Sequence, residues 1–356
     1  MSKHRFVLAT LAVLGLVVAA CGSDDEATGT EGAEVVLEGT TVRLLAHDSF
    51  ALTEELLVEF EADTGMTVEI LQPGDAVSVV NRAILTKNDP EADVLFGVDN
   101  NVLSRALAED LFQPYEAEGL ENVDPSLILD DQHRVTPIDV GDVCLNYDIA
   151  WFDDAGLPPP ASLDHLIDPA YQGLTVVQNP AASTPGLAFL LATIETYGDD
   201  GWLDWWSDLR ANDVLVTDGW SEAYFGPFTV GGGGDRPIVV SYASSPPAEV
   251  VFGELEAAPT AVLAESCFRQ IEFAGVLSGA ANPEGARVLI AWLLGADVQA
   301  DIPLNMFVFP AVTDTPLPEV FVEWAEVPEA PLSMSPDRID ENRDDWVDAW
   351  TDTVLR

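Results

Sequence analysis

Basic residues are scarce in this sequence. Only 14 of its 356 residues are Lys or Arg, against 62 that are Asp or Glu, and the formal net charge is -48. This composition argues against nucleic-acid binding, because phosphate groups need basic contacts. The negative charge can attract a cationic ligand over a long range. It can also be a solubility adaptation, which the spread of carboxylates along the whole chain favours.

Cysteine and histidine are rare as well: the sequence contains three cysteines and four histidines. The sequence contains no CxxC or HExxH motif and no cluster of His with Cys, so we expect no metal site. A hydrolytic triad is not indicated either, because the segment GWSEA at 219–223 departs from the G-x-S-x-G pattern at Ala223. Together these absences predict a protein that is not an enzyme and has no cofactor.

Long apolar runs are missing after the first twenty residues. Residues 6–20 form one apolar stretch behind a short basic start. A run of about 15 residues is too short for a membrane span and is typical of a signal peptide. Small residues directly before Cys21 resemble the site at which bacterial lipoproteins are cut and acylated. We therefore expect a lipoprotein signal peptide at 1–20 and a lipid anchor at Cys21. An ordinary signal peptide that contains Cys21 is the alternative.

The residues that follow, 21–38, are small, polar and acidic. They carry too little apolar surface to fold, so we expect a flexible tether. The remaining length of ~320 residues exceeds the usual size of one domain and favours two lobes. Cys144 and Cys267 form an even pair, as an exported protein in an oxidising compartment would use. The chain is therefore expected to be extracytoplasmic and held at the cell membrane.

From residue 39 the hydrophobic pattern alternates between the periods of strands and helices. This alternation predicts parallel strands and an α/β layer fold. The order of these elements predicts that the chain starts one lobe, crosses into a second near 138 and returns near 260. The expected bounds are 39–137 plus 262–356 for lobe 1 and 138–261 for lobe 2, with a cleft between them. The predicted strands are 41–46, 66–71, 92–98, 174–180, 214–219 and 267–280, and the predicted helices are 52–65, 76–87, 100–112, 183–198, 201–213, 282–301 and 344–356. The segment 236–253 is predicted to give a strand, a loop and then a helix.

Four polar loops follow predicted strands, where ligands sit in α/β folds. Aromatic faces stack on flat ligands and attract cations, and a carboxylate offsets a positive charge. A helix cap at Ser183 and Thr184 and a core position for Tyr242 are the alternatives. The loops are GDAVS (74–78), ASTPGL (182–187), DGWSEAY (218–224) and SYASSP (241–246), and they supply Asp75, Ser183, Thr184, Trp220, Tyr242, Ser244 and Ser245.

Seven segments between about 42 and 312 carry a resemblance to a known family. They are DSF (48–50), GDAVSVVNR (74–82), ADVLFGVDNN (92–101), NPAASTPGLAFLL (179–191), YGDD (197–200), DGWSEAY (218–224) and SYASSP (241–246). In these segments the chain resembles the thiamine-binding lipoproteins and periplasmic proteins of ABC transporters. The resemblance implies a type II periplasmic-binding fold with hinge crossovers. It further implies a function, which is to close on thiamine, often also on its phosphates, and to deliver it to a permease driven by an ATPase. We expect a monomer.

The resemblance also implies the ligand contacts. Carried over residue by residue, they are Asp75, Ala76, Ser183, Thr184, Trp220, Tyr242, Ala243, Ser244, Ser245 and Pro246, with His47, Asp48 and Phe307 as further positions. Three of these depart from the family pattern. Ala76 stands where the family usually has glycine, His47 where it often has tyrosine, and Phe307 where tryptophan is expected. The last two changes keep a flat ring, so stacking is expected to survive.

In two-lobe binding folds of this type the segments at the crossovers run side by side. Cys144 follows the first crossover and Cys267 the second, so we expect a disulfide between them. Two buried free thiols are the alternative.

Two other ligand classes remain open for the same fold. An iron-binding protein of this fold typically presents adjacent tyrosines to the metal, and this sequence has no Tyr-Tyr pair. A binder of polyamines or other organic cations is the second alternative.

Overall fold

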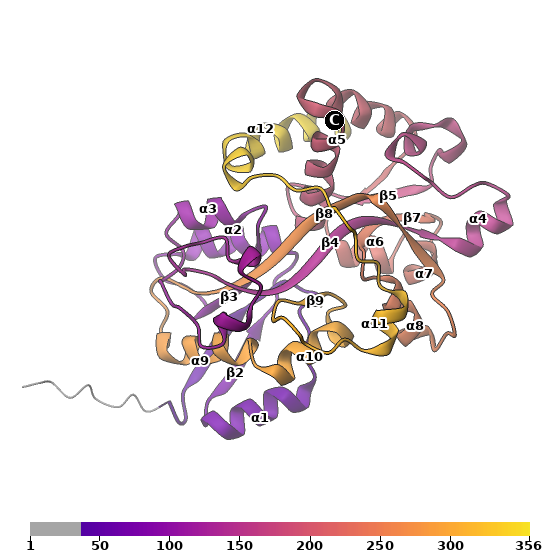
Figure 1. Ribbon diagram of the computed structural model, residues 1–356. Coiled ribbons are helices and arrows are strands. Elements are labelled where there is room, and N and C mark those ends of the chain that lie inside the picture. Colours follow the sequence, from indigo (N-terminus) through magenta and orange to yellow (C-terminus); the bar gives the residue numbers. More distant parts are fainter. Residues whose placement is uncertain (1–36) are drawn as a thin grey trace, which may run out of the picture. The chain divides into compact units, whose positions relative to one another are not determined.

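The computed structural model describes residues 37–356 (Figure 1). The expected signal peptide, the expected anchor at Cys21 and most of the expected tether lie outside the described residues. The described strands form one mixed sheet in the order β2-β1-β3-β8-β4-β7-β5-β6, and β9 pairs with β4. Their bounds are β1 Thr41–Leu45, β2 Thr67–Leu71, β3 Val94–Asp99, β4 Thr136–Asp148, β5 Thr175–Gln178, β6 Leu215–Thr217, β7 Ile238–Tyr242, β8 Thr260–Val276 and β9 Phe309–Pro310.

The helices alternate with these strands along the chain. They are α1 Glu54–Thr64, α2 Ala76–Thr86, α3 Leu103–Ala108, α4 Ile149–Ala155, α5 Thr184–Ala211, α6 Trp220–Phe225, α7 Thr229–Gly232, α8 Pro246–Gly253, α9 Pro283–Leu293, α10 Ala296–Asn305, α11 Glu319–Trp324 and α12 Pro336–Val354. The predicted α/β class is therefore confirmed.

The sheet consists of two parallel groups joined by two antiparallel strands. In one group β1 pairs in parallel with β2 and β3, and in the other β5 pairs in parallel with β6 and β7. Strands β4 and β8 pair antiparallel to each other, and each also pairs with one of the groups. Figure 1 shows β4 and β8 running together from one group of helices to the other. The lobe boundaries stated above stay predictions.

One helix prediction is corrected by the structure, and another is confirmed. The region 282–301 was expected to be one helix, but the chain leaves the helix after α9 and resumes it in α10, because Gly295 is extended with φ -64° and ψ 148°. The two helices expected at 183–198 and 201–213 are confirmed, because α5 is interrupted at Gly198, whose φ of 70° and ψ of 174° are not helical. Strand β8 also begins earlier than predicted, because residues 260–263 pair with the end of β4.

The C-terminal helix α12 packs on α5. The indole of Trp350 is fully buried and meets that of Trp206 edge to face, with ring centroids 5.5 Å apart. Trp346 and Val354 are buried on the same helix. Aromatic pairs of this geometry add to the stabilisation that burial gives. The last helix is thus fixed to the part of α5 that follows Gly198.

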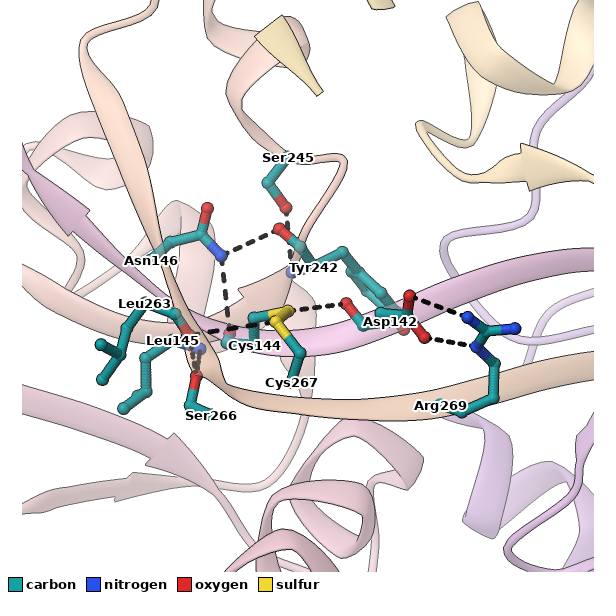
Figure 2. The surroundings of a disulfide bond; sticks show 10 residues. All are labelled: Asp142, Cys144, Leu145, Asn146, Tyr242, Ser245, Leu263, Ser266, Cys267 and Arg269. Carbon is teal, nitrogen blue, oxygen red and sulfur yellow. Dashed lines mark hydrogen bonds and ion pairs between the residues drawn. A yellow bond between two sulfur atoms is a disulfide. The ribbon is translucent and has the colours of Figure 1, made fainter. Parts of the chain in front are cut away.

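Cys144 and Cys267 are joined by a disulfide between β4 and β8 (Figure 2). Their Cα atoms are 4.2 Å apart, well inside the 7 Å or so beyond which no bridge can form. The ladder between β4 and β8 is interrupted here, with residues 264–267 of β8 looping past Cys144. Ser266 closes the irregularity, because its hydroxyl accepts the backbone N–H of Leu145 at 2.8 Å. The disulfide therefore links the two strands at the point where their regular backbone pairing is interrupted.

Candidate functional site

One cavity of about 220 Å³ lies among the loops at the carboxyl ends of the parallel strands. Most of the sequence-predicted ligand positions line it. They are His47, Asp48, Asp75, Ala76, Thr184, Trp220, Tyr242, Ser245 and Phe307. His47 and Phe307 are separated by 260 positions in the sequence. The fold therefore brings together residues that are far apart along the chain.

An aromatic wall forms one side of the cavity. Trp220 begins α6 and stacks on Tyr224 one turn later, with ring centroids 4.9 Å apart and planes 24° from parallel. The indole N–H of Trp220 donates to the hydroxyl of Ser241 at 2.9 Å, which fixes the ring orientation. Tyr242 stands beside it at a centroid distance of 6.2 Å. A side chain at Gly141 would place Cβ 2.9 Å from the Tyr242 ring, so glycine is needed there.

Asp75 connects the start of α2 with the starts of two other helices. Its two carboxylate oxygens accept the backbone N–H groups of Thr184 and Trp220, each at 3.2 Å. Negative charge at helix N-termini is stabilising. Burial raises the pKa of Asp75 above its ordinary value, against the opposing effect of these hydrogen bonds and of the nearby His47.

The remaining predicted positions lie behind the cavity wall. Ser183 is fully buried before the first residue of α5. The hydroxyl of Ser244 donates to the backbone carbonyl of Phe307 at 2.6 Å, and so supports that part of the cavity lining. Ala243 packs against the disulfide, and Pro246 starts α8 as a buried residue. These residues shape the site from behind.

Phe307, which lines the cavity, is the centre of a second group of aromatic residues. This residue has φ 54°, a left-handed conformation that non-glycine residues rarely adopt. Its ring packs between Phe252 at 5.2 Å and Phe321 at 6.1 Å. The aromatic ring expected at this position is thus present and held in place by neighbours from α8 and α11.

The floor of the cavity contains the carboxyl group of Glu272, and two more carboxyl groups lie buried beside it. Asp99 on β3 and Asp139 on β4 both face Glu272 on β8 in register. We call Asp99, Glu272 and Asp139 the carboxylate row. They are 0%, 7% and 0% exposed, and Glu272 lines the cavity. Nε2 of His47 lies 3.4 Å from a carboxylate oxygen of Glu272.

Burial and mutual repulsion shift the acidity of these groups. Burial, together with the charge of Glu272, raises the pKa of Asp99 to about 7. Burial also raises the pKa of Asp139 well above its ordinary value, reinforced by the charge of Glu272 and a hydrogen bond to it. Burial alone would lower the pKa of His47, but the negative charges of Glu272, Asp75 and Asp48 outweigh it and raise that pKa. Asp99, Asp139 and His47 therefore all have pKa values shifted toward retention of their protons.

Sequence reasoning missed the row and part of the wall. Asp99 lies in the loop VDNN and Asp139 in the crossover segment, but neither was singled out as a ligand position. The signal for Glu272 was a lone acidic residue within an otherwise apolar strand, IEFAGV (271–276). Tyr224 is the last residue of the loop DGWSEAY and Phe225 follows it directly, and both line the cavity.

Comparison with known proteins identifies the family. The model of a family described as a bacterial extracellular solute-binding protein matches residues 89–329. The chain belongs to this family. A thiamine-binding periplasmic protein of Brucella suis biovar 1 is 32% identical over 325 residues, which cover 89% of this chain and 92% of that protein. An iron uptake protein A1 of Synechocystis sp. is 23% identical over 336 residues, which cover 89% and 88%.

A solved structure gives the same result for the fold. A structure named as a periplasmic thiamin binding protein matches with a TM-score of 0.80 and 27% identity, covering 91% of this chain and 100% of that chain. These findings confirm the resemblance stated from the sequence and the two-lobe type II fold class. A solute-binding protein holds its solute without transforming it, and it works outside the cytoplasm. The protein is therefore a transport component and not an enzyme.

Two features are absent from residues 37–356. In this part of the chain no helix is long and apolar enough to cross a membrane. In the same residues no group of three or more His, Cys, Asp and Glu side chains is placed to hold a metal ion.

Proposed function

We propose that this protein captures thiamine outside the cytoplasm and delivers it to an ABC permease and its ATPase. The observation that carries the proposal is the pairing of an aromatic wall with an acidic floor in one cavity. Thiamine is a flat cation, with an aminopyrimidine ring and a positively charged thiazolium ring. Stacked aromatic side chains suit the rings, and the carboxylates suit the charge.

The arrangement of the cavity suggests how the ligand is held. Trp220 and Tyr224 form a stacked pair, and Trp220 and Tyr242 line the cavity with part of their rings accessible. We propose that Trp220 and Tyr242 contact the rings of thiamine, with Phe307 on the opposite side. Asp75, Ala76, Thr184 and Ser245 are proposed to contact its polar groups.

The iron alternative has less support at the site. Tyr224 and Tyr242 both line the cavity, but they come from α6 and β7 and are not adjacent in sequence. A different organic cation stays the second candidate, because the acidic floor suits any such ligand. The binding measurements described next also compare the affinity for thiamine with that for its phosphates.

Native mass spectrometry of protein purified from its own host tests the proposal directly. We expect a bound mass equal to thiamine, thiamine monophosphate or thiamine diphosphate. Calorimetric titration of the stripped protein with thiamine should then give saturable binding, while spermidine and ferric citrate serve as controls for the alternatives. Retention of iron or of a polyamine, with no binding of thiamine or its phosphates, would overturn the proposal.

We further propose that the mature protein is a monomer anchored by a lipid on Cys21. The anchor rests on the sequence before Cys21, which lies outside the described residues. Substitution of Cys21 by Ser should release the protein from the membrane fraction of its host, and the mass of the N-terminal peptide should lose its acyl chains. Release of the parent protein as a soluble form would contradict the anchor. Sedimentation of the mature domain measures its oligomeric state.

A further inference from the structure

Two β-bulges create the carboxylate row. Strand β3 has one extra residue, Gly97, opposite the step from Ala274 to Phe273 of β8. Strand β4 has one extra residue, Ile138, opposite the step from Phe273 to Glu272. A bulge changes which face the following side chains occupy. After these two bulges, Asp99 and Asp139 come directly opposite Glu272, although like charges opposite one another destabilise a sheet.

Gly97 also makes room for His47. Its φ of +88° is a left-handed conformation, and a Cβ atom on this residue would come within 2.4 Å of the His47 ring. The bulge on β3 therefore places the imidazole against Glu272. The structure thus keeps three carboxyl groups and one imidazole close together, and Glu272 and His47 line the cavity.

The three acids of the row are not equivalent. Both oxygens of Asp99 accept N–H groups of Asn101, each at 3.0 Å. Among the described residues, no N–H or O–H group donates to Asp139, which leaves it free to donate its own proton to Glu272. Glu272 lines the cavity, and its neighbours Gln270 and His47 lie at 3.3 and 3.4 Å. These distances exceed the usual range of about 2.7–3.2 Å for strong N–H donors.

We infer that Glu272 recognises the positive charge of the ligand and that a cation displaces protons from the groups around it. This inference rests on the proposed function, since it assigns the charge contact of the same cavity. Asp75 was the carboxylate expected for this role, but both of its oxygens already accept backbone N–H groups. Glu272 is the specificity-determining residue, and Asp139 and Asp99 are positioning residues that hold the exchangeable protons.

The direction of the proton exchange follows from the surroundings of Glu272. A cation placed there favours the ionised forms of Asp99 and Asp139 and disfavours protonated His47. Each change releases a proton, so affinity rises as the pH is raised toward about 7, the pKa of Asp99 in the free protein. The titratable and charged groups that face the row are His47 and Asp48 after β1, Asp75 at α2, Asp99 on β3, Asp139 on β4, Tyr242 on β7 and Arg343 on α12.

The first test compares thiamine with its uncharged analogue, in which a thiophene ring replaces the thiazolium. The parent protein should prefer thiamine by about 10- to 100-fold, the range expected for a charged hydrogen-bond or ion contact. The variant Glu272→Gln keeps the shape of the side chain and should lose most of this preference through weaker binding of thiamine alone. Asp75→Asn should weaken both ligands alike and keep the preference.

Glu265→Gln is the matched control, because Glu265 is an exposed glutamate on the same strand. It should leave both affinities unchanged. If the parent binds neither ligand, the proposed function itself fails. If the parent binds thiamine and Glu272→Gln keeps the full preference for the cation, the role of Glu272 is overturned.

The second test counts protons. Calorimetric titration at pH 6.5 in buffers of different ionisation enthalpy should show a fraction of a proton released per thiamine bound, and less for the uncharged analogue. Asp99→Asn and Asp139→Asn should each reduce the release, and a thermal melt confirms that each variant is folded. Equal proton release for the two ligands would overturn the proton exchange. If both variants unfold, the proton release of the parent protein with thiamine and with the uncharged analogue still tests the proton exchange.

Discussion

Asp75 hydrogen-bonds to the first residues of two helices that belong to the other group of strands. One carboxylate oxygen accepts the N–H of Thr184 at the start of α5, and the other accepts that of Trp220 at the start of α6. Asp75 itself precedes α2, which follows β2. This single side chain therefore links the two parallel groups across the cavity.

Substitution of Asp75 by Ala should weaken both the fold and the binding. Removing one partner of a charged hydrogen bond costs about 1.5–3 kcal/mol. We expect thiamine affinity to fall by roughly 10- to 100-fold and the melting temperature to decrease, because the ligand-contacting ends of α5 and α6 lose their common acceptor. Calorimetry and thermal denaturation measure the two effects. Asp63→Ala, at an exposed position of α1, is the control, and an equal result for both variants would contradict the role of Asp75.

Trp220 should be important for affinity and less so for stability. Truncation of an aromatic hot-spot residue costs about 2–4 kcal/mol, so Trp220→Ala should weaken thiamine binding by roughly 30- to 1000-fold. Trp220→Phe keeps a ring but loses the hydrogen bond to Ser241, and should retain most of the affinity. Fluorescence titration and melting of the ligand-free protein separate the roles. A large loss of stability with unchanged affinity would mean that Trp220 is a core residue.

The sequence indicated the cavity through its loops. Asp75, Thr184, Trp220 and Tyr242 could be predicted because each lies just after a strand with a clear hydrophobic pattern, and parallel strands present these loops at one edge. The local hydrophobic pattern is therefore sufficient to predict these four positions. The family resemblance then supplied His47 and Phe307.

The floor of the cavity could not be predicted in the same way. Glu272 and Asp139 meet only because a bulge at Ile138 shifts the register of two strands that are far apart in the sequence. Periodicity within either strand gives no sign of that shift. The break at Gly295 was missed for a similar reason, since the apolar pattern continues through α9 and α10 although the backbone does not.

The raised pKa of Asp99 predicts that the protein is more stable in mild acid. Between pH ~4 and about 7 the folded protein keeps a proton on Asp99 that the unfolded chain releases. The contribution of Asp99 to the free energy of unfolding therefore falls as the pH rises through this window. A shift from 3.8 to about 7 corresponds to roughly 4 kcal/mol at most.

Melting temperatures of the parent and of Asp99→Asn between pH 5 and pH 8 test this prediction. Repulsion among the many surface carboxylates destabilises both proteins as the pH rises, so the difference between the two curves isolates Asp99. The parent should lose more stability than the variant toward pH 8, because asparagine cannot ionise. Parallel curves would show that Asp99 does not titrate in this range.

The last prediction concerns the disulfide between Cys144 and Cys267. It closes a loop with a sequence separation of 123 residues, and the chain-entropy model assigns such a loop a stabilisation of about 5 kcal/mol, although measured gains are often smaller. Neither cysteine lines the cavity. Reduction should therefore lower the melting temperature by several degrees and change thiamine affinity little. The double variant Cys144→Ala/Cys267→Ala should melt like the reduced parent and should not respond to reductant. Thiol counting on denatured, unreduced protein from an oxidising compartment decides the pairing, because two free thiols in the mature domain would exclude the bridge.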